Sequence, residues 1–183
     1  MSLLEKYPLE STKPLKKTIS GSLVIFFIFL IFWFLNFISY LPFEVVETIA
    51  PELKDFYFNP FQYINLFLLT FLVLFVALKY IYETYYMKYY FYDLSGKNLI
   101  IRKGVFSRNE ITLPINRLQD VYVDQDILDR LFGLYDVHVS SATAISGNLS
   151  HIDGINKNSA EQIKKLVLSG IHKGKWIIPT KFK

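Results

Sequence analysis

Three histidines, His138, His151 and His172, are the side chains of this chain best suited to acid–base or metal chemistry. A catalytic triad needs a nucleophile, a base and an orienting acid that converge in space, and no nucleophile-elbow motif surrounds any serine. His138 and Ser140 fall on one face of a predicted strand, but alternate residues of any strand do so. The spacing of His138, His151 and Asp153 matches no metal-ligand motif. We therefore predict no catalytic residue, no metal site and no cofactor, and hence a protein that is not an enzyme.

Other chemistry is excluded by what the chain lacks. It contains no cysteine, which removes thiolate nucleophiles and cysteine ligands. No phosphate-binding P-loop and no dinucleotide fingerprint occurs in the sequence. The net charge is only +4 and the basic residues are scattered, so we expect no nucleic-acid partner.

The charged residues that do cluster lie between Leu113 and Val137. Arg117 is open to two interpretations: it anchors a nearby acid, or it binds a phosphate. Arg130 follows Asp126 by four residues, so the two can pair on a helix and Arg130 is the second candidate for a partner or phosphate contact. The acids of this stretch either cap turns or form a docking surface for a basic partner. They are Asp120, Asp124, Asp126, Asp129 and Asp136.

A short helical turn must position these charges. Asp126 is a typical N-cap, and Asp129 stands three residues later, as in a capping box. Gly133 then suits the left-handed residue that ends such a turn. Strands are predicted on both sides, over 118–125 and 134–143.

Two long apolar segments precede this region. The first, 19–41, contains no charged residue, and the second, 61–82, contains only Lys79 near its end. About 20 helical residues cross a hydrocarbon core of about 30 Å, and neither segment has the polar face of a soluble helix. We therefore predict two transmembrane helices.

Basic residues indicate the orientation of these helices. Lysines outnumber acids before the first segment, acids outnumber lysines between the segments, and basic residues outnumber acids again after the second. The positive-inside rule places both termini in the cytoplasm and the connecting segment outside. The expected location is the cytoplasmic membrane, with the chain crossing it twice.

The remainder predicts one α+β domain. Strands are expected over 87–94, 98–104, 105–115 and 148–155, besides the two above. An amphipathic helix follows, with Asn158 as its N-cap and Gly170 as its stop. Ala160, Ile163, Leu166 and Val167 are expected to form its buried face. The predicted plan is a cytoplasmic N-terminal segment 1–18, the membrane segment 19–82, a cytoplasmic domain 83–172 and a tail 173–183.

The tail combines bases with bulky apolar residues. Lys173, Lys175 and Lys181 surround Trp176, a mixture that suits the surface of an anionic membrane. These four residues are candidate lipid contacts. The alternative is that the segment around Trp176 packs onto the domain as a further strand.

The stretch "LPINRLQDV", followed by "QDILDRLFGLYDVHVSSAT", "HIDGI" and "AEQIKKL", resembles the bacterial pleckstrin-homology-like domain, a family in which one or two hydrophobic helices precede the domain. The resemblance implies an antiparallel β-barrel or pair of crossed sheets, closed by a C-terminal helix. It implies no activity, because the family has no established catalytic motif. The short segment after Thr143 departs from the family's pattern.

These observations favour a non-enzymatic module held at the cytoplasmic face of the membrane. Its expected partners are the lipid bilayer together with a protein partner, copies of itself or lipid headgroups. The alternative is a membrane-integral enzyme or an accessory subunit of a transport complex. That alternative needs polar groups inside the spans, where only Asn65 and Thr70 approach the interior.

Overall fold

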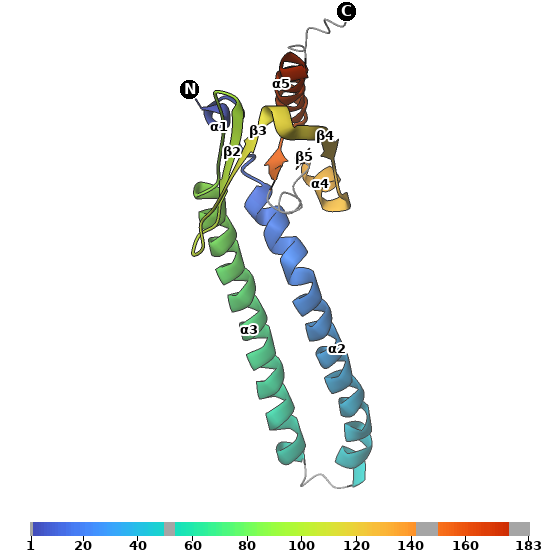
Figure 1. Cartoon of the computed structure of the whole chain (residues 1–183). Coiled ribbons are helices and arrows are strands. Elements are labelled where there is room, and N and C mark those ends of the chain that lie inside the picture. The colour runs from blue at the N-terminus through green and yellow to red at the C-terminus, as the bar shows by residue number, and fades with distance from the viewer. Residues whose placement is uncertain (1, 50–53, 142–149, 176–183) are drawn as a thin grey trace, which may run out of the picture. The chain divides into compact units, whose positions relative to one another are not determined.

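A computed structural model describes the backbone of residues 2–49, 54–141 and 150–175, and the side chains of 2–35, 63–141 and 150–171. The chain divides into two compact units (Figure 1). One contains the apolar helical segment Lys17–Ile81. The other joins the N-terminal segment, as far as Lys16, to the region from Tyr82 onward. The units are described separately below as the apolar unit and the sheet unit.

Two long helices, α2 (Lys13–Ile49) and α3 (Lys54–Lys88), supply the apolar unit. Each contains a segment long and apolar enough to cross a membrane, Lys13–Leu35 in α2 and Tyr63–Lys88 in α3. Many bulky apolar side chains described in these segments are exposed: Phe27, Trp33 and Phe67 are each more than half exposed. That these helices cross a membrane stays a prediction, which their length and exposed apolar side chains support.

The sheet unit contains two three-stranded antiparallel sheets. Strands β1 (Phe91–Ser95), β2 (Asn98–Lys103) and β3 (Asn109–Pro114) form the first in that order. A single turn of 3-10 helix, η2 (Ile115–Arg117), leads to the second sheet. That sheet consists of β4 (Leu118–Asp124), β5 (Tyr135–Ser141) and β6 (His151–Ile155), with the short helix α4 (Ile127–Phe132) between β4 and β5.

The terminal helix α5 (Lys157–Lys175) closes this unit by packing on η2, β4 and β5. Ala160, Ile163 and Val167 are fully buried on its inner face, together with Ile171. The prediction that Leu166 belongs to this buried face is wrong, because this residue is 38% exposed. Six residues after Ala160, it has turned about 240° around the helix.

Both predicted ends of α5 are also wrong. Asn156, not Asn158, caps the helix, because its Oδ1 accepts a hydrogen bond of 2.8 Å from the Ser159 amide. Gly170 does not stop the helix, which continues to Lys175. A Cβ on Gly170 would lie 2.7 Å from the Ile115 side chain. The glycine therefore permits a close approach between α5 and η2. In the sequence, a glycine that allows such packing cannot be told from one that ends a helix.

Two predicted strands begin too early. Helix α3 extends through Lys88, so the strand expected over 87–94 starts at Phe91. The strand expected over 105–115 starts at Asn109, because Gly104 has a φ of 113° and turns the chain before it. A Cβ there would collide with the Ser107 carbonyl oxygen, so only glycine fits.

The predicted helical turn at α4 is confirmed. The Asp126 carboxylate accepts from the Asp129 amide at 2.7 Å, and Asp129 accepts in return from the Asp126 amide. Gly133 is left-handed, with a φ of 68°, and ends the helix. The capping box therefore forms as the spacing predicted.

The N-terminal segment is part of the sheet unit. Leu3, in the short helix α1 (Leu3–Lys6), is buried in the core, and its amide donates to the Asp93 carboxylate at 2.8 Å. The Tyr92 hydroxyl donates to the Tyr7 carbonyl, and Glu10 accepts from the Asn156 side chain at 2.9 Å. The chain up to Lys16 therefore packs with the region from Tyr82 onward.

Candidate functional site

Arg117 and Arg130, the arginines singled out in the sequence, are both exposed and lie on different elements, at the end of η2 and within α4. Neither makes an ion pair or side-chain hydrogen bond with another described residue. The expected pairing of Arg130 with Asp126 is wrong: the Asp126 carboxylate lies 3.0 Å from the Lys16 ammonium instead. Lys16 precedes Asp126 by more than a hundred residues, so helical spacing could not reveal the partner.

The tail residues divide between described and undescribed parts of the chain. Lys173 and Lys175 belong to α5, which corrects the expectation that the tail begins outside the helix. Trp176 and Lys181 lie outside the described residues. Lipid contact by these four residues stays a prediction.

Two buried lysines connect the N-terminal segment to the second sheet. The Lys13 ammonium lies 2.7 Å from the Asp153 carboxylate, and both side chains are almost fully buried. One turn later, Lys16 lies 2.8 Å from Asp129, also buried, and 3.0 Å from Asp126. Desolvation tends to raise the pKa of Asp126, but the Asp129 amide and Lys16 bind its charged form, and its pKa is lowered. We call Lys13, Lys16, Asp129 and Asp153 the ionic latch.

A column of rings extends across the second sheet beside the latch. Tyr122, His138 and His151 occupy paired positions on β4, β5 and β6. Their rings stack at 4.9 Å and 5.3 Å between centroids. The His151 Nδ1 lies 3.3 Å from the ammonium of Lys103, which is itself buried against the Tyr90 ring. His138 and His151 thus have packing roles in this column.

Asp124, Asp136 and His138 bring three potential metal-ligand atoms within 4.8 Å of one another. The group differs from the set weighed in the sequence, because Asp124 and Asp136 join His138 in place of His151 and Asp153. Burial and the charge of Asp153 raise the pKa of Asp136, while the Gly154 amide donates to its Oδ1 at 2.8 Å. His138 Nε2 lies 3.2 Å from Asp124, so this group already has internal partners.

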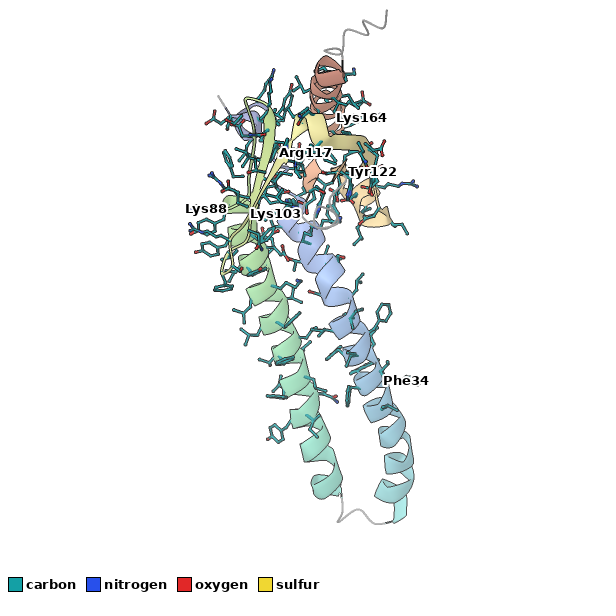
Figure 2. The ribbon with its side chains drawn as sticks, in the orientation of Figure 1. Phe34, Lys88, Lys103, Arg117, Tyr122 and Lys164 are labelled. Atoms are coloured by element: carbon teal, nitrogen blue, oxygen red, sulfur yellow. The ribbon has the colours of Figure 1, made fainter. Side chains whose placement is uncertain are left out.

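A cavity of about 710 Å³ opens beside the end of α3 and the first sheet. Its walls carry four basic side chains, Lys88, Arg102, Lys103 and Arg108, and a single acid, Glu110. Figure 2 shows Lys88 at the end of α3 and Lys103 on the adjoining sheet. The cavity is therefore a positively charged concave site.

The four basic side chains of this cavity differ in the groups that they contact. Arg102 pairs with Glu110 at 2.6 Å, across the β2–β3 register, which cancels one positive charge with the one acid. The Arg108 guanidinium lies 5.5 Å from the centre of the Tyr89 ring, and Lys88 is exposed. Lys103 is buried and contacts His151 and the Tyr90 ring, so Lys88 and Arg108 are the exposed bases of the cavity that do not pair with Glu110.

The sequence contained a weak signal for this cavity that was missed. Arg102, Lys103 and Arg108 flank Gly104, and a glycine that turns the chain brings bases on its two sides together. Assigning the segment from 105 onward to a continuous strand separated Arg108 from the other two. Lys88 lay in a predicted strand, so its position at the end of α3 was not foreseen.

A family model described as a bacterial PH domain matches residues 14–171 of this chain. The chain belongs to the bacterial PH domain family. The match covers nearly all of both long helices and the six strands described, so both apolar segments lie within the matched region. Comparison with curated proteins and with solved structures finds no match.

The family confirms the resemblance seen in the sequence and fits the two antiparallel sheets closed by α5. It is not typically an enzyme family. The function of this bacterial PH domain must therefore be argued from its surface.

Proposed function

We propose that this bacterial PH domain is a non-enzymatic, membrane-anchored module at the cytoplasmic face, which binds anionic lipid headgroups in the basic cavity. The observation that carries the proposal is the cavity itself, where four basic side chains and one acid surround about 710 Å³ of open space. A phosphate group would receive charge-assisted hydrogen bonds from several sides at once. The positive-inside rule supports a cytoplasmic position for this surface.

The location of the cavity in the chain supports a lipid ligand. Lys88 is the last residue of α3, the second candidate span, and Tyr89 follows it directly. Basic and aromatic residues at the end of a span belong at headgroup level. A ligand that lives in the same membrane also needs no long-range capture, because tethering keeps its local concentration high.

The proposal is tested with the full chain purified in detergent and titrated with short-chain phosphatidylglycerol or phosphatidylcholine. We expect the anionic lipid to bind more tightly, and added salt to weaken its binding. Each base near an anionic surface contributes about 1 kcal/mol, or about fivefold in affinity. Lys88→Ala and Arg108→Ala should each lose about that factor.

Lys164→Ala and Lys165→Ala on α5 are the matched controls, because they remove the same charge outside the cavity. Equal losses in the cavity and control variants would reduce the effect to net charge and overturn the site. Equal binding of the two lipids by the unaltered chain would overturn headgroup recognition altogether.

A further inference from the structure

Helix α4 exposes two apolar side chains to solvent. Ile127 is 86% exposed and Leu131 is 76% exposed. They are four residues apart, so they share one face of the helix. The other side of α4 is engaged, because Asp129 is buried in the ionic latch. The exposed pair therefore has a fixed direction and no described partner that covers it.

The ionic latch holds helix α4, which carries this face, against the start of α2. Asp126 and Asp129 of α4 bind Lys16, and Lys16 is the last residue of the sheet unit before the apolar unit begins at Lys17. Lys16 also lies in the first turn of the candidate span Lys13–Leu35. Helix α4 is thus attached to the point where the chain enters its first apolar segment.

A second exposed apolar site lies near the other boundary of the apolar unit in the chain. Phe106, in the turn between β2 and β3, is 91% exposed. Its one described ring contact is a stack on Tyr82, with 6.1 Å between centroids. Tyr82 is the first residue of the sheet unit after the apolar unit ends at Ile81. Helix α4, which carries Ile127 and Leu131, thus contacts Lys16, and Phe106 contacts Tyr82; Lys16 and Tyr82 both adjoin the apolar unit in the chain.

We propose that Ile127, Leu131 and Phe106 form a lipid-contact surface that sits in the interfacial layer of the bilayer crossed by α2 and α3. The occupant is the bilayer and not a soluble partner, because α4 and Phe106 each contact a residue that adjoins one end of the apolar segment in the chain. Bulky apolar side chains beside a basic residue suit the interfacial layer. The long side chain of Arg130 on α4 can extend from this layer to headgroup phosphates. The proposal rests on the membrane anchoring of the proposed function but not on headgroup binding in the cavity.

The test uses single cysteines in the full chain, which has no native cysteine to interfere. Ile127→Cys, Leu131→Cys and Phe106→Cys are labelled with a polarity-sensitive fluorophore and reconstituted into nanodiscs. Leu166→Cys is the matched control, because Leu166 is also an exposed leucine on a helix. Figure 1 shows α5 at the other end of the sheet unit from the β2–β3 turn.

We expect the three labels to emit at shorter wavelength than the control, and nitroxide lipids with the quencher near the headgroup to quench them more strongly. Aqueous iodide should show the reverse order. If iodide quenches all four labels equally, the proposal is overturned. Blue emission that ignores nitroxide lipids and grows with protein concentration would identify a second copy as the occupant instead. Because lipid titration of the cavity variants is measured separately, either proposal can fail alone.

Discussion

At the scale of single residues, backbone conformation and charge burial decide most of the outcomes. Gly133 needs a positive φ, and the pattern of Asp126, Asp129 and Gly133 was sufficient to predict it. Gly170 looked similar in sequence but serves a close contact with Ile115. A glycine's role depends on what faces it, and local sequence contains that information only when the role is a local turn.

Replacing Gly133 with valine should destabilise the domain. A β-branched residue at a φ of 68° is strained, by about 1–2 kcal/mol. No atom lies within 4 Å of the position that a Cβ would occupy, so strain is the only cost. Thermal unfolding of the full chain in detergent measures the loss, and Gly133→Asn should show a smaller one because asparagine tolerates this conformation. An unchanged midpoint for the valine variant would contradict the cap.

Asp136 should make the stability depend on pH. Burial and the neighbouring Asp153 charge raise its pKa above the ordinary value of 3.8. A raised carboxyl pKa favours the protonated form in the folded state, so the stabilisation is complete below 3.8 and is lost as pH rises through the folded pKa. Asp136→Asn keeps the oxygen that accepts from Gly154 but carries no charge.

We therefore expect Asp136→Asn to match the original chain at low pH and to exceed its stability at neutral pH. Unfolding midpoints measured across this pH range test the expectation. Asp120→Asn, on the exposed part of β4, is the control and should follow the original chain. A variant that is less stable than the original chain at neutral pH would show that the Asp136 charge supports the fold.

At the scale of elements, periodic patterns in the sequence predicted which helices and strands form but misplaced several of their ends. The two spans, the sheets, α4 and α5 all follow from composition and spacing, because each is specified by neighbours in sequence. The ends of α3 and α5 do not, since tyrosines such as Tyr89 suit helix and strand alike and the α5 cap lies two residues early. The basic cavity was missed for the same reason, because it depends on where α3 ends and β3 begins.

Because of the ionic latch, the first turn of α2 is part of the sheet unit. Lys13→Ala should destabilise the fold by about 3–5 kcal/mol, because it removes the ammonium 2.7 Å from a buried carboxylate. Chemical unfolding in mild detergent measures this loss. Lys6→Ala is the control, since Lys6 is exposed and should change the stability by less than about 0.5 kcal/mol. Similar effects for the two variants would show that the buried pair does not hold the segment.

At the scale of the whole molecule, topology can be tested with added cysteines. We expect Thr48→Cys, between the predicted spans, to react with an impermeant thiol reagent in intact cells. Glu161→Cys, exposed on α5, should react only after the membrane is permeabilised. Ser159, a neighbouring choice, would be uninformative because it is 6% exposed. The opposite labelling pattern would reverse the orientation.

The same latch has a consequence for how the protein is made. Lys13 leaves the ribosome 140 residues before Asp153, its hydrogen-bond partner. Both apolar segments are synthesised in the interval, so Lys13 cannot form its native contact until Asp153 has been made. Non-local contacts of this kind slow folding and leave partners exposed until synthesis is complete. A fragment that begins after α3 would contain the six strands that the structure describes and still lack Lys13 and Lys16, which bind Asp153 and Asp129.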